Sequence, residues 1–413
     1  MKIIQRPGVL VPLSLLLAFA IIRATTTLAA DSGFRHTPSG PGYGREVVTQ
    51  LQREVSPEII ILPSSLSGSQ APDTIVSHTL TISNVGDADL NWTVIEQATP
   101  GARNDSLAER TKESLVSGLL YNNGPLINSP GTGVGGADES ILQDLTLGMN
   151  SRGFGNQLAL NNRIADNFSV PDGKNWLVDE ILFYGYQVNS PITSTFTEIN
   201  YRIWDGVPGD PGSSIVFGDT TTNQLSQTIW SGVYRVKEST SGTSAARPVM
   251  ANTVNGGVNL SPGMYWLDWQ ADVIFNPVVS GPWAPPIAIS GTITTGNGLQ
   301  SFDNGVNWEP VLDSGTSTAQ GFPFVITGQA TCIPSEISWT LVSPQNGSTQ
   351  PGSATVLTVA FDSTGLSDGI YQGTLCIETN DSSNQVVDLP ITMMVSQEKN
   401  FPNYLPTVIR SGS

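Results

Sequence analysis

The chain contains little histidine, little cysteine and few basic residues. Its 413 residues include 2 His and 2 Cys, and 18 Lys and Arg stand against 35 Asp and Glu, which gives a formal net charge of −17. A chain this acidic repels phosphate backbones and anionic lipid surfaces, and it has no basic run interleaved with aromatic residues to overcome that repulsion. We therefore expect no nucleic acid among its partners.

The scarcity of histidine limits the chemistry that the chain can perform. The two histidines are His36, in a Gly-, Pro- and Ser-rich segment, and His78, on a strand-like run next to Ser77. A nucleophilic triad needs a base within reach of its nucleophile, and a zinc site needs several nitrogen or sulfur ligands. The Gly-rich stretch 131–136 is not followed by Lys-Ser or Lys-Thr, so it is not a phosphate loop. These absences favour a non-enzymatic protein.

Long apolar runs are also rare. The 42 Gly and 28 Pro, with 13% charged residues, fit short strands and many turns better than helices. The clearest long apolar run, 9–22, is flanked by basic residues and followed by small ones, which predicts a secretory signal peptide at 1–30, cut near Ala29 or Ala30. A retained membrane anchor is the weaker interpretation because the run is short. Cleavage would remove three basic and no acidic residues, which takes the charge from −17 to −20. We expect a secreted protein, extracellular or at the cell surface, with no membrane insertion after cleavage.

Both cysteines, Cys332 and Cys376, lie in the C-terminal part of the chain. After secretion they would meet an oxidising environment, so we predict a disulfide between them. Closing a loop of this length stabilises by about 4 kcal/mol in the chain-entropy model. The spacing is not the C-x-x-C of redox and metal sites.

Strand-like runs occur at both ends of the folded part. Three such runs precede a polar connector and four follow a long central region, and three plus four is the number of strands in a minimal immunoglobulin-like sandwich. We predict that 57–99 and 330–397 form one Ig-like seven-stranded β-sandwich. The seven runs are 59–62, 75–85, 90–96, 338–342, 354–361, 370–379 and 385–395.

The central region is predicted to be a second sandwich inserted into the first. Its short runs of alternating apolar residues are separated by clusters of Asn, Asp, Gly and Pro, without helical patterns between them. The chain is therefore expected to be all-β, with an inserted jelly-roll β-sandwich at 119–329. The remaining segments are a linker at 31–56, a connector at 100–118 and a C-terminal tail at 398–413.

Short motifs add a family resemblance. The runs TLTISN at 79–84, FDSTGL at 361–366 and GTLC at 373–376 resemble the Ig-like repeats of the ASH and BACON type in secreted bacterial proteins. The run RIADNFSVP at 163–171 is similar to a jelly-roll module of secreted bacterial proteins. The first resemblance implies a spacer or binding module without a common active site, so both imply architecture more than activity.

Seven of the nine tryptophans fall in the central region, which makes it the candidate binding unit. Strand alternation puts Trp266 and Asp268 on one face, and Trp204 adjoins Asp205; each pair would suit stacking on a sugar ring, although most tryptophans in a sandwich are simply packed. Trp283 lies in a Gly- and Pro-rich loop, where an exposed aromatic is a better binding candidate.

Carboxylates suggest two further roles. Asp138 and Glu139 in one turn, and Asp205 and Asp210 in another, lie beside flexible backbone and would suit calcium, although neither turn has the EF-hand pattern and a solvated turn is the competing interpretation. We expect no other cofactor. A glycoside hydrolase would need two carboxylates across the scissile bond. The candidates in the central region are Asp179, Glu180, Glu198, Asp205, Asp268 and Asp303.

Taken together, the sequence predicts a non-catalytic extracellular or cell-surface binding module. The inserted jelly roll would recognise an extracellular glycan or a surface protein, with carbohydrate slightly favoured because of the tryptophans. A purely structural surface spacer is the alternative, followed by a carboxylate-pair glycoside hydrolase. The sequence makes no prediction about oligomeric state.

Overall fold

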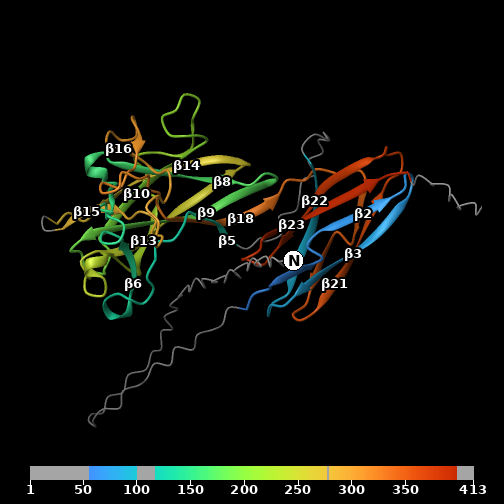
Figure 1. Cartoon of the computed structure of the whole chain (residues 1–413), viewed down its shortest axis with the longest axis horizontal. Helices are drawn as coiled ribbons and strands as arrows, with labels where there is room; N and C mark the ends of the chain where they lie inside the picture. Colours follow the sequence, from blue (N-terminus) through green and yellow to red (C-terminus); the bar gives the residue numbers. More distant parts are fainter. Residues whose placement is uncertain (1–54, 100–116, 277–278, 398–413) are drawn as a thin grey trace, which may run out of the picture. The chain divides into compact units, whose positions relative to one another are not determined.

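The computed structural model describes residues 55–99, 117–276 and 279–397, which form an all-β structure, as predicted (Figure 1). Within these ranges the helical elements are three single 3-10 turns, η1 (Val134–Gly136), η2 (Leu158–Leu160) and η3 (Glu238–Thr240). None of the helices there is long and apolar enough to cross a membrane. The predicted signal peptide and tail lie outside the described residues, as do nearly all of the predicted linker and connector.

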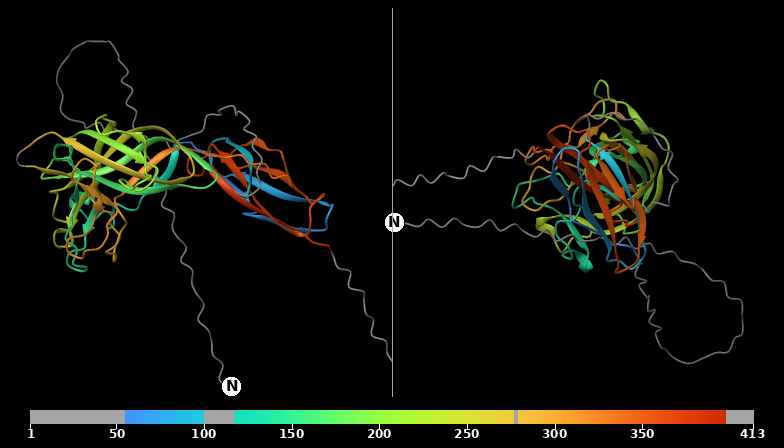
Figure 2. Two further views of the ribbon diagram at one scale, coloured as in Figure 1. Left: turned by 90° about the horizontal axis from the view of Figure 1, so that it is seen from above. Right: turned by 90° about the vertical axis from the view of Figure 1, so that its right-hand side faces the viewer.

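Strands from the two ends of the folded chain share one pair of sheets (Figures 1 and 2, blue and red ribbons). The four-stranded sheet has the order β1 (Ile59–Leu62), β3 (Ile75–Asn84), β21 (Ala354–Asp362), β19 (Thr340–Ser343). The five-stranded sheet has the order β2 (Leu66–Gln70), β23 (Val386–Val395), β22 (Gly369–Thr379), β4 (Leu90–Ala98), β20 (Asn346–Thr349).

The alternation of polar and apolar residues explains this pairing. In β3, Leu80 and Ile82 point into the core while Thr79 and Thr81 lie on the other face, and β21 pairs antiparallel with β3 from Ala354↔Ser83 to Asp362↔Ile75. Apolar side chains of both sheets, including Trp92, form one buried cluster. These contacts support the interpretation of 57–99 and 330–397 as one split sandwich.

The two sheets contain nine strands, two more than the seven runs predicted. The additional strands are β2, with the sequence LSGSQ, and β20, with the sequence NGST. Gly, Ser and Asn are poor strand formers, so neither segment has the apolar alternation that marks a strand. Each joins an edge of the sheet, β2 parallel to β23 and β20 antiparallel to β4, so backbone pairing decides their conformation.

The central region forms two larger sheets (Figure 2). The six-stranded sheet has the order β11 (Ile215–Gly218), β10 (Phe196–Trp204), β14 (Gly263–Val273), β8 (Arg163–Val170), β16 (Leu299–Ser301), β17 (Glu309–Pro310). The eight-stranded sheet has the order β5 (Gly118–Asn122), β18 (Phe324–Cys332), β9 (Lys174–Val188), β13 (Pro248–Leu260), β12 (Leu225–Lys237), β6 (Asp138–Leu142), and β15 (Ser280–Ala284) and β7 (Phe154–Gly155) attach to it.

An aromatic core joins these two sheets. Trp269 of β14 stacks on Phe183 of β9 with ring centroids 4.4 Å apart, and Phe322 and Phe324 approach Trp269 edge-on. The buried cluster draws apolar side chains from β8, β10 and β14 on one side and from β9, β13 and β18 on the other. Two sheets packed over one core make a β-sandwich. Its description as an inserted jelly roll remains our interpretation.

The predicted disulfide between Cys332 and Cys376 is confirmed, with Cα atoms 6.2 Å apart. Cys332 ends β18 and Cys376 lies in β22, so the bond ties the eight-stranded sheet to the five-stranded sheet. The buried ammonium of Lys174 donates to Cys376 Sγ at 2.8 Å and pairs with Asp388 at 2.5 Å.

Candidate functional site

A groove of about 530 Å³ lies in the central region, where β7, β15 and β16 meet the turn η2. β15 pairs with β7 through Trp283↔Gly155 and with β9 through Ser280↔Val188 and Trp283↔Tyr186, and the β15–β9 register is irregular between Ser280 and Trp283. The Gly281-Pro282 peptide bond at this irregularity is cis. Local pairing of these short strands therefore brings Trp283 to the groove wall.

Apolar side chains form much of the lining. Trp283 is half-buried, and its indole Nε1 donates to Ser280 Oγ at 3.3 Å. Phe302 is 55% exposed although it is a large aromatic residue, and Leu160 and Leu312 are also exposed. Exposed aromatic and apolar surface in a concave site is typical of ligand binding, because burying it from water is favourable.

Amide side chains fix the polar part of the groove. Gln157 Oε1 accepts a hydrogen bond from Asn162 Nδ2 at 2.7 Å, and Gln157 Nε2 donates to the Pro282 carbonyl at 2.8 Å. Gln300 Nε2 donates to the Gly155 carbonyl at 2.8 Å. These bonds orient the amides and leave carbonyl oxygens of Asn162 and Gln300 as acceptors for hydroxyl groups of a ligand.

A buried carboxylate shapes another wall. Asp313 accepts hydrogen bonds from the backbone N–H groups of Asn150 and Ser151, at 2.9 and 2.7 Å, and from Gly315 and Thr316 in its own turn. Although burial raises the pKa of Asp313, these backbone donors outweigh it and lower the pKa below its usual value. Ser151 and Ser314, both lining the groove, are linked through their hydroxyl oxygens at 3.2 Å. Asp313 does not itself line the groove, but its hydrogen bonds fix the backbone of the residues that do.

Of the predicted ligand-binding residues, Trp283 lies in the groove and the others do not. Asp268, Trp266 and Trp204 are only 0%, 4% and 9% exposed, so they form no stacking surface, and that prediction is wrong for these three. Strand alternation does put Trp266 and Asp268 on the face opposite the aromatic core, but the partner side chains of β8 and β10 cover them. Asp205 is exposed and accepts from the Ser214 N–H at 2.6 Å.

The residues predicted to bind calcium are engaged in separate turns. Asp138 accepts from the Gly131 N–H at 2.7 Å, and the buried carboxylate of Glu139 accepts from Thr132, Ser241 and Gly242. Asp210 lies exposed in its turn. In the part of the chain that the structure describes, no three His, Cys, Asp or Glu residues form a group that could hold a metal ion. Calcium binding stays an untested prediction.

The groove also lacks the groups that hydrolysis would need. None of its lining residues within the described ranges is Asp or Glu, so it offers no pair of carboxyl groups across a scissile bond. Asp268 is paired with two arginines, and Asp303 is held by Ser301 and Asn307, whose hydrogen bonds lower its pKa to about 2.

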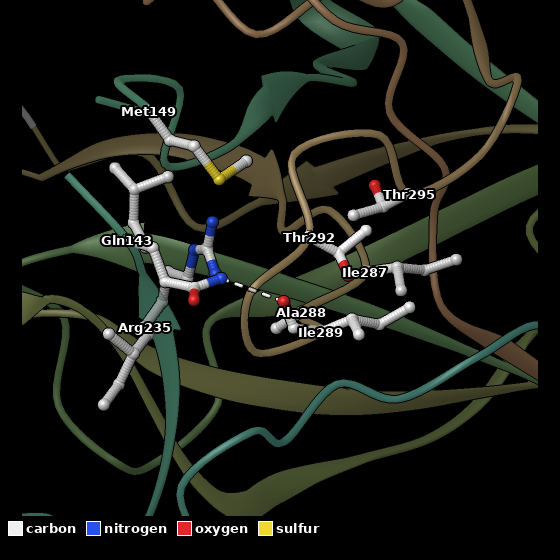
Figure 3. Close-up of a pocket in the computed structure, with 10 residues that line it drawn as sticks. Gln143, Met149, Arg235, Ile287, Ala288, Ile289, Thr292 and Thr295 are labelled. Carbon is white, nitrogen blue, oxygen red and sulfur yellow. Dashed lines mark hydrogen bonds between the residues drawn. The ribbon is translucent and has the colours of Figure 1, made fainter. Parts of the chain in front are cut away.

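A second cavity, of about 10 Å³, is lined by Gln143, Met149 and the buried Arg235 (Figure 3). Gln143 Nε2 donates to the Ile289 carbonyl across it at 2.9 Å. Its volume is that of about one water molecule, so it is not a ligand site.

Comparison with known families adds one finding. A family model described as the viral BACON domain matches residues 316–389, which contain β18 to β22 and part of β23. The match spans less than a fifth of the chain and does not reach β1, β3 or β4. A comparison with curated proteins gave no match. The family match indicates a β-sandwich module of a non-enzymatic, binding type in this part of the chain.

Sequence reasoning missed most of the groove. Gln157, Asn162, Gln300 and Phe302 come from separate turns and short strands, and no motif links them. The Gly- and Pro-rich loop around Trp283 was the one feature of the sequence that pointed to a residue of the groove. The remaining lining residues come together only through the pairing of β15 with β7 and of β16 with β8.

Proposed function

We propose that this protein is a non-catalytic binding module that acts outside the cell or at its surface, and that its central sandwich recognises carbohydrate in the Trp283 groove. The proposal of an extracellular location is supported by the predicted signal peptide and by the disulfide. The family match, to a module of a binding type, is compatible with a non-catalytic role.

The observation that carries the proposal is the composition of the groove. It combines the half-buried Trp283 and the exposed Phe302 with oriented amides whose oxygens can accept hydrogen bonds. A sugar ring presents an apolar face for stacking and hydroxyl groups for hydrogen bonds, so it suits both halves of this lining.

A structural spacer is the second candidate, and the other tryptophans favour it. A spacer would bury its tryptophans, and Trp176, Trp204, Trp266 and Trp269 of the central region are indeed buried. The other three, Trp230, Trp283 and Trp308, are only half-buried. Binding activity of the groove therefore separates the two candidates.

The test is a glycan-array screen of the full chain, followed by titration calorimetry on any glycan that binds. We expect Trp283→Ala to weaken binding at least tenfold, corresponding to loss of about 1.4 kcal/mol of stacking energy. Phe275→Ala is the matched control, because Phe275 is 86% exposed and does not line the groove. Phe302→Ala removes a second aromatic side chain from the same groove and should also weaken binding. Because Phe302 is more exposed than Trp283, this change should disturb the core less than Trp283→Ala does. An array without any bound glycan, or equal affinity in all variants, would overturn the proposal in favour of the spacer.

A further inference from the structure

The charges of three arginines, Arg152, Arg235 and Arg247, act on the phenol of Tyr186. Arg235 Nε donates to the Arg152 carbonyl at 2.8 Å, and the Arg235 backbone N–H donates to the Arg247 carbonyl at 2.9 Å. A Cβ at Gly153, next to Arg152, would lie 2.5 Å from Tyr186 Oη, so the phenol reaches this same point of the chain. We call these four residues the arginine cluster.

Among the residues that the structure describes, no carboxylate is paired with the arginine cluster. The ion pairs between residues in the described ranges involve Arg163, Arg202, Lys174 and Lys237, and none involves the three arginines of the cluster. The carboxylate that attracts Arg235, that of Asp313, already accepts four backbone N–H groups. The buried Nε of Arg152 has no hydrogen-bond partner among the described residues. Three arginines without an ion-pair partner in the described ranges are unexpected in a chain with a net charge of −17.

The three guanidinium groups act on one another. The pKa of Arg235 is lowered to about 10, mainly by burial and also by the charges of Arg152 and Arg247, while Tyr186 and Asp313 act in the opposite direction. Burial also lowers the pKa of Arg247, and the charge of Arg152 adds to this shift. Grouped like charges in a partly desolvated site cost free energy unless a counterion is present.

We propose that the arginine cluster binds an oxyanion, namely a phosphate, sulfate or carboxylate group. The planar fork of a guanidinium matches two oxygens of such a group, and the Tyr186 hydroxyl can supply another donor. Arg235 is buried and donates to the Arg152 carbonyl and to Ser140 Oγ, whereas Arg152 and Arg247 are half-buried, so an anion from solvent would contact these two. The group can belong to a free inorganic ion or to an acidic sugar. This inference does not depend on the function proposed for the Trp283 groove.

The test uses the full chain and titration calorimetry with inorganic phosphate, inorganic sulfate and glucuronate, each at constant ionic strength set with chloride. We expect saturable binding of at least one of these anions, with a rise in melting temperature that follows the same titration. The double variant Arg152→Gln/Arg247→Gln should weaken anion binding at least tenfold. Arg247→Lys keeps the positive charge without the guanidinium fork, so its affinity should lie between those of the unmodified protein and the double variant.

Lys237→Gln is the matched control, because it also removes one positive charge but its ammonium is already paired with Asp144 at 3.2 Å. It should bind the anions as the unmodified protein does. The proposal is overturned if no anion binds above the effect of chloride, or if the double variant binds as tightly as Lys237→Gln. Binding of glucuronate alone would assign the cluster to acidic sugars, and binding of phosphate or sulfate to inorganic anions.

Discussion

Asp268 Oδ2 accepts a hydrogen bond from Arg202 Nε at 2.8 Å, and both side chains are buried. Asp268 Oδ1 accepts from Arg163 Nε at 2.5 Å, so one carboxylate pairs with two guanidinium groups. Trp204 Nε1 donates to the same carboxylate. These residues come from three neighbouring strands, β14, β10 and β8, and they form the polar layer on the outer side of the six-stranded sheet.

Replacement of Asp268 by Asn should destabilise the protein strongly. The change leaves two buried positive charges without a counterion, and breaking a buried ion pair in this way costs about 3–5 kcal/mol. Urea unfolding followed by tryptophan fluorescence measures the loss. Asp210→Asn, at an exposed turn, should change stability by less than about 0.5 kcal/mol. Equal urea midpoints for the two variants would contradict this account of Asp268.

Replacement of Gln157 by Ala should weaken glycan binding through the geometry of the groove. Gln157 forms hydrogen bonds with both the Asn162 amide and the Pro282 carbonyl, so replacing it by Ala removes the bonds that orient Asn162 and the strand carrying Trp283. We expect affinity to fall about tenfold and stability by about 1–3 kcal/mol. Gln157→Glu keeps the acceptor for Asn162 and should lose less affinity. Calorimetry that shows unchanged binding in Gln157→Ala would place the glycan elsewhere.

The protein should become more stable as the pH falls from 7 to 5, because the buried carboxylate of Asp166 takes up a proton. Burial raises its pKa from 3.8 to about 6, although the Phe322 and Asn167 N–H groups donate to its carboxylate. The native state therefore takes up a proton before the unfolded chain does, and stability is lost again as the pH rises through about 6. The free energy of unfolding rises by about 3 kcal/mol at most, a value reached only at a pH low enough to protonate Asp166 in the unfolded chain as well.

The measurement is urea unfolding at several pH values, compared between the wild-type protein and Asp166→Asn. The variant has no group at this position that titrates, so the rise in stability between pH 7 and 5 should be smaller in it. Identical pH slopes in the two proteins would show that Asp166 does not titrate in this range.

Loss of the disulfide should destabilise the protein without changing the fold. Cys332 and Cys376 are 44 residues apart in sequence, and in the chain-entropy model their bond contributes about 4 kcal/mol. The double variant Cys332→Ser/Cys376→Ser should unfold at lower urea than the oxidised protein, and a thiol reductant should bring the wild-type protein close to the variant. The reductant should leave the variant itself unchanged. A variant as stable as the oxidised protein would show that the cross-link contributes nothing.

Local patterns in the sequence predicted much of the fold. Strand-like apolar runs marked all seven of the predicted strands of the split sandwich, and in 90–96 apolar residues alternate with others, as a half-buried strand needs. The same alternation puts Leu267 and Trp269 on one face, which the structure shows to be the core, and Trp266 with Asp268 on the other. It did not mark β2 or β20, whose conformation depends on backbone pairing with a neighbouring strand.

By itself, the sequence determined the all-β class, the pairing of the two cysteines and one wall of the groove at Trp283, because these depend on residue type and local periodicity. Tertiary structure decided whether a side chain is buried or exposed, and so removed Trp204, Trp266 and Asp268 from the candidate surface. It also decided that Arg152, Arg235 and Arg247 lie together. Contacts between residues far apart in the chain depend on strand order and register, which no local pattern encodes.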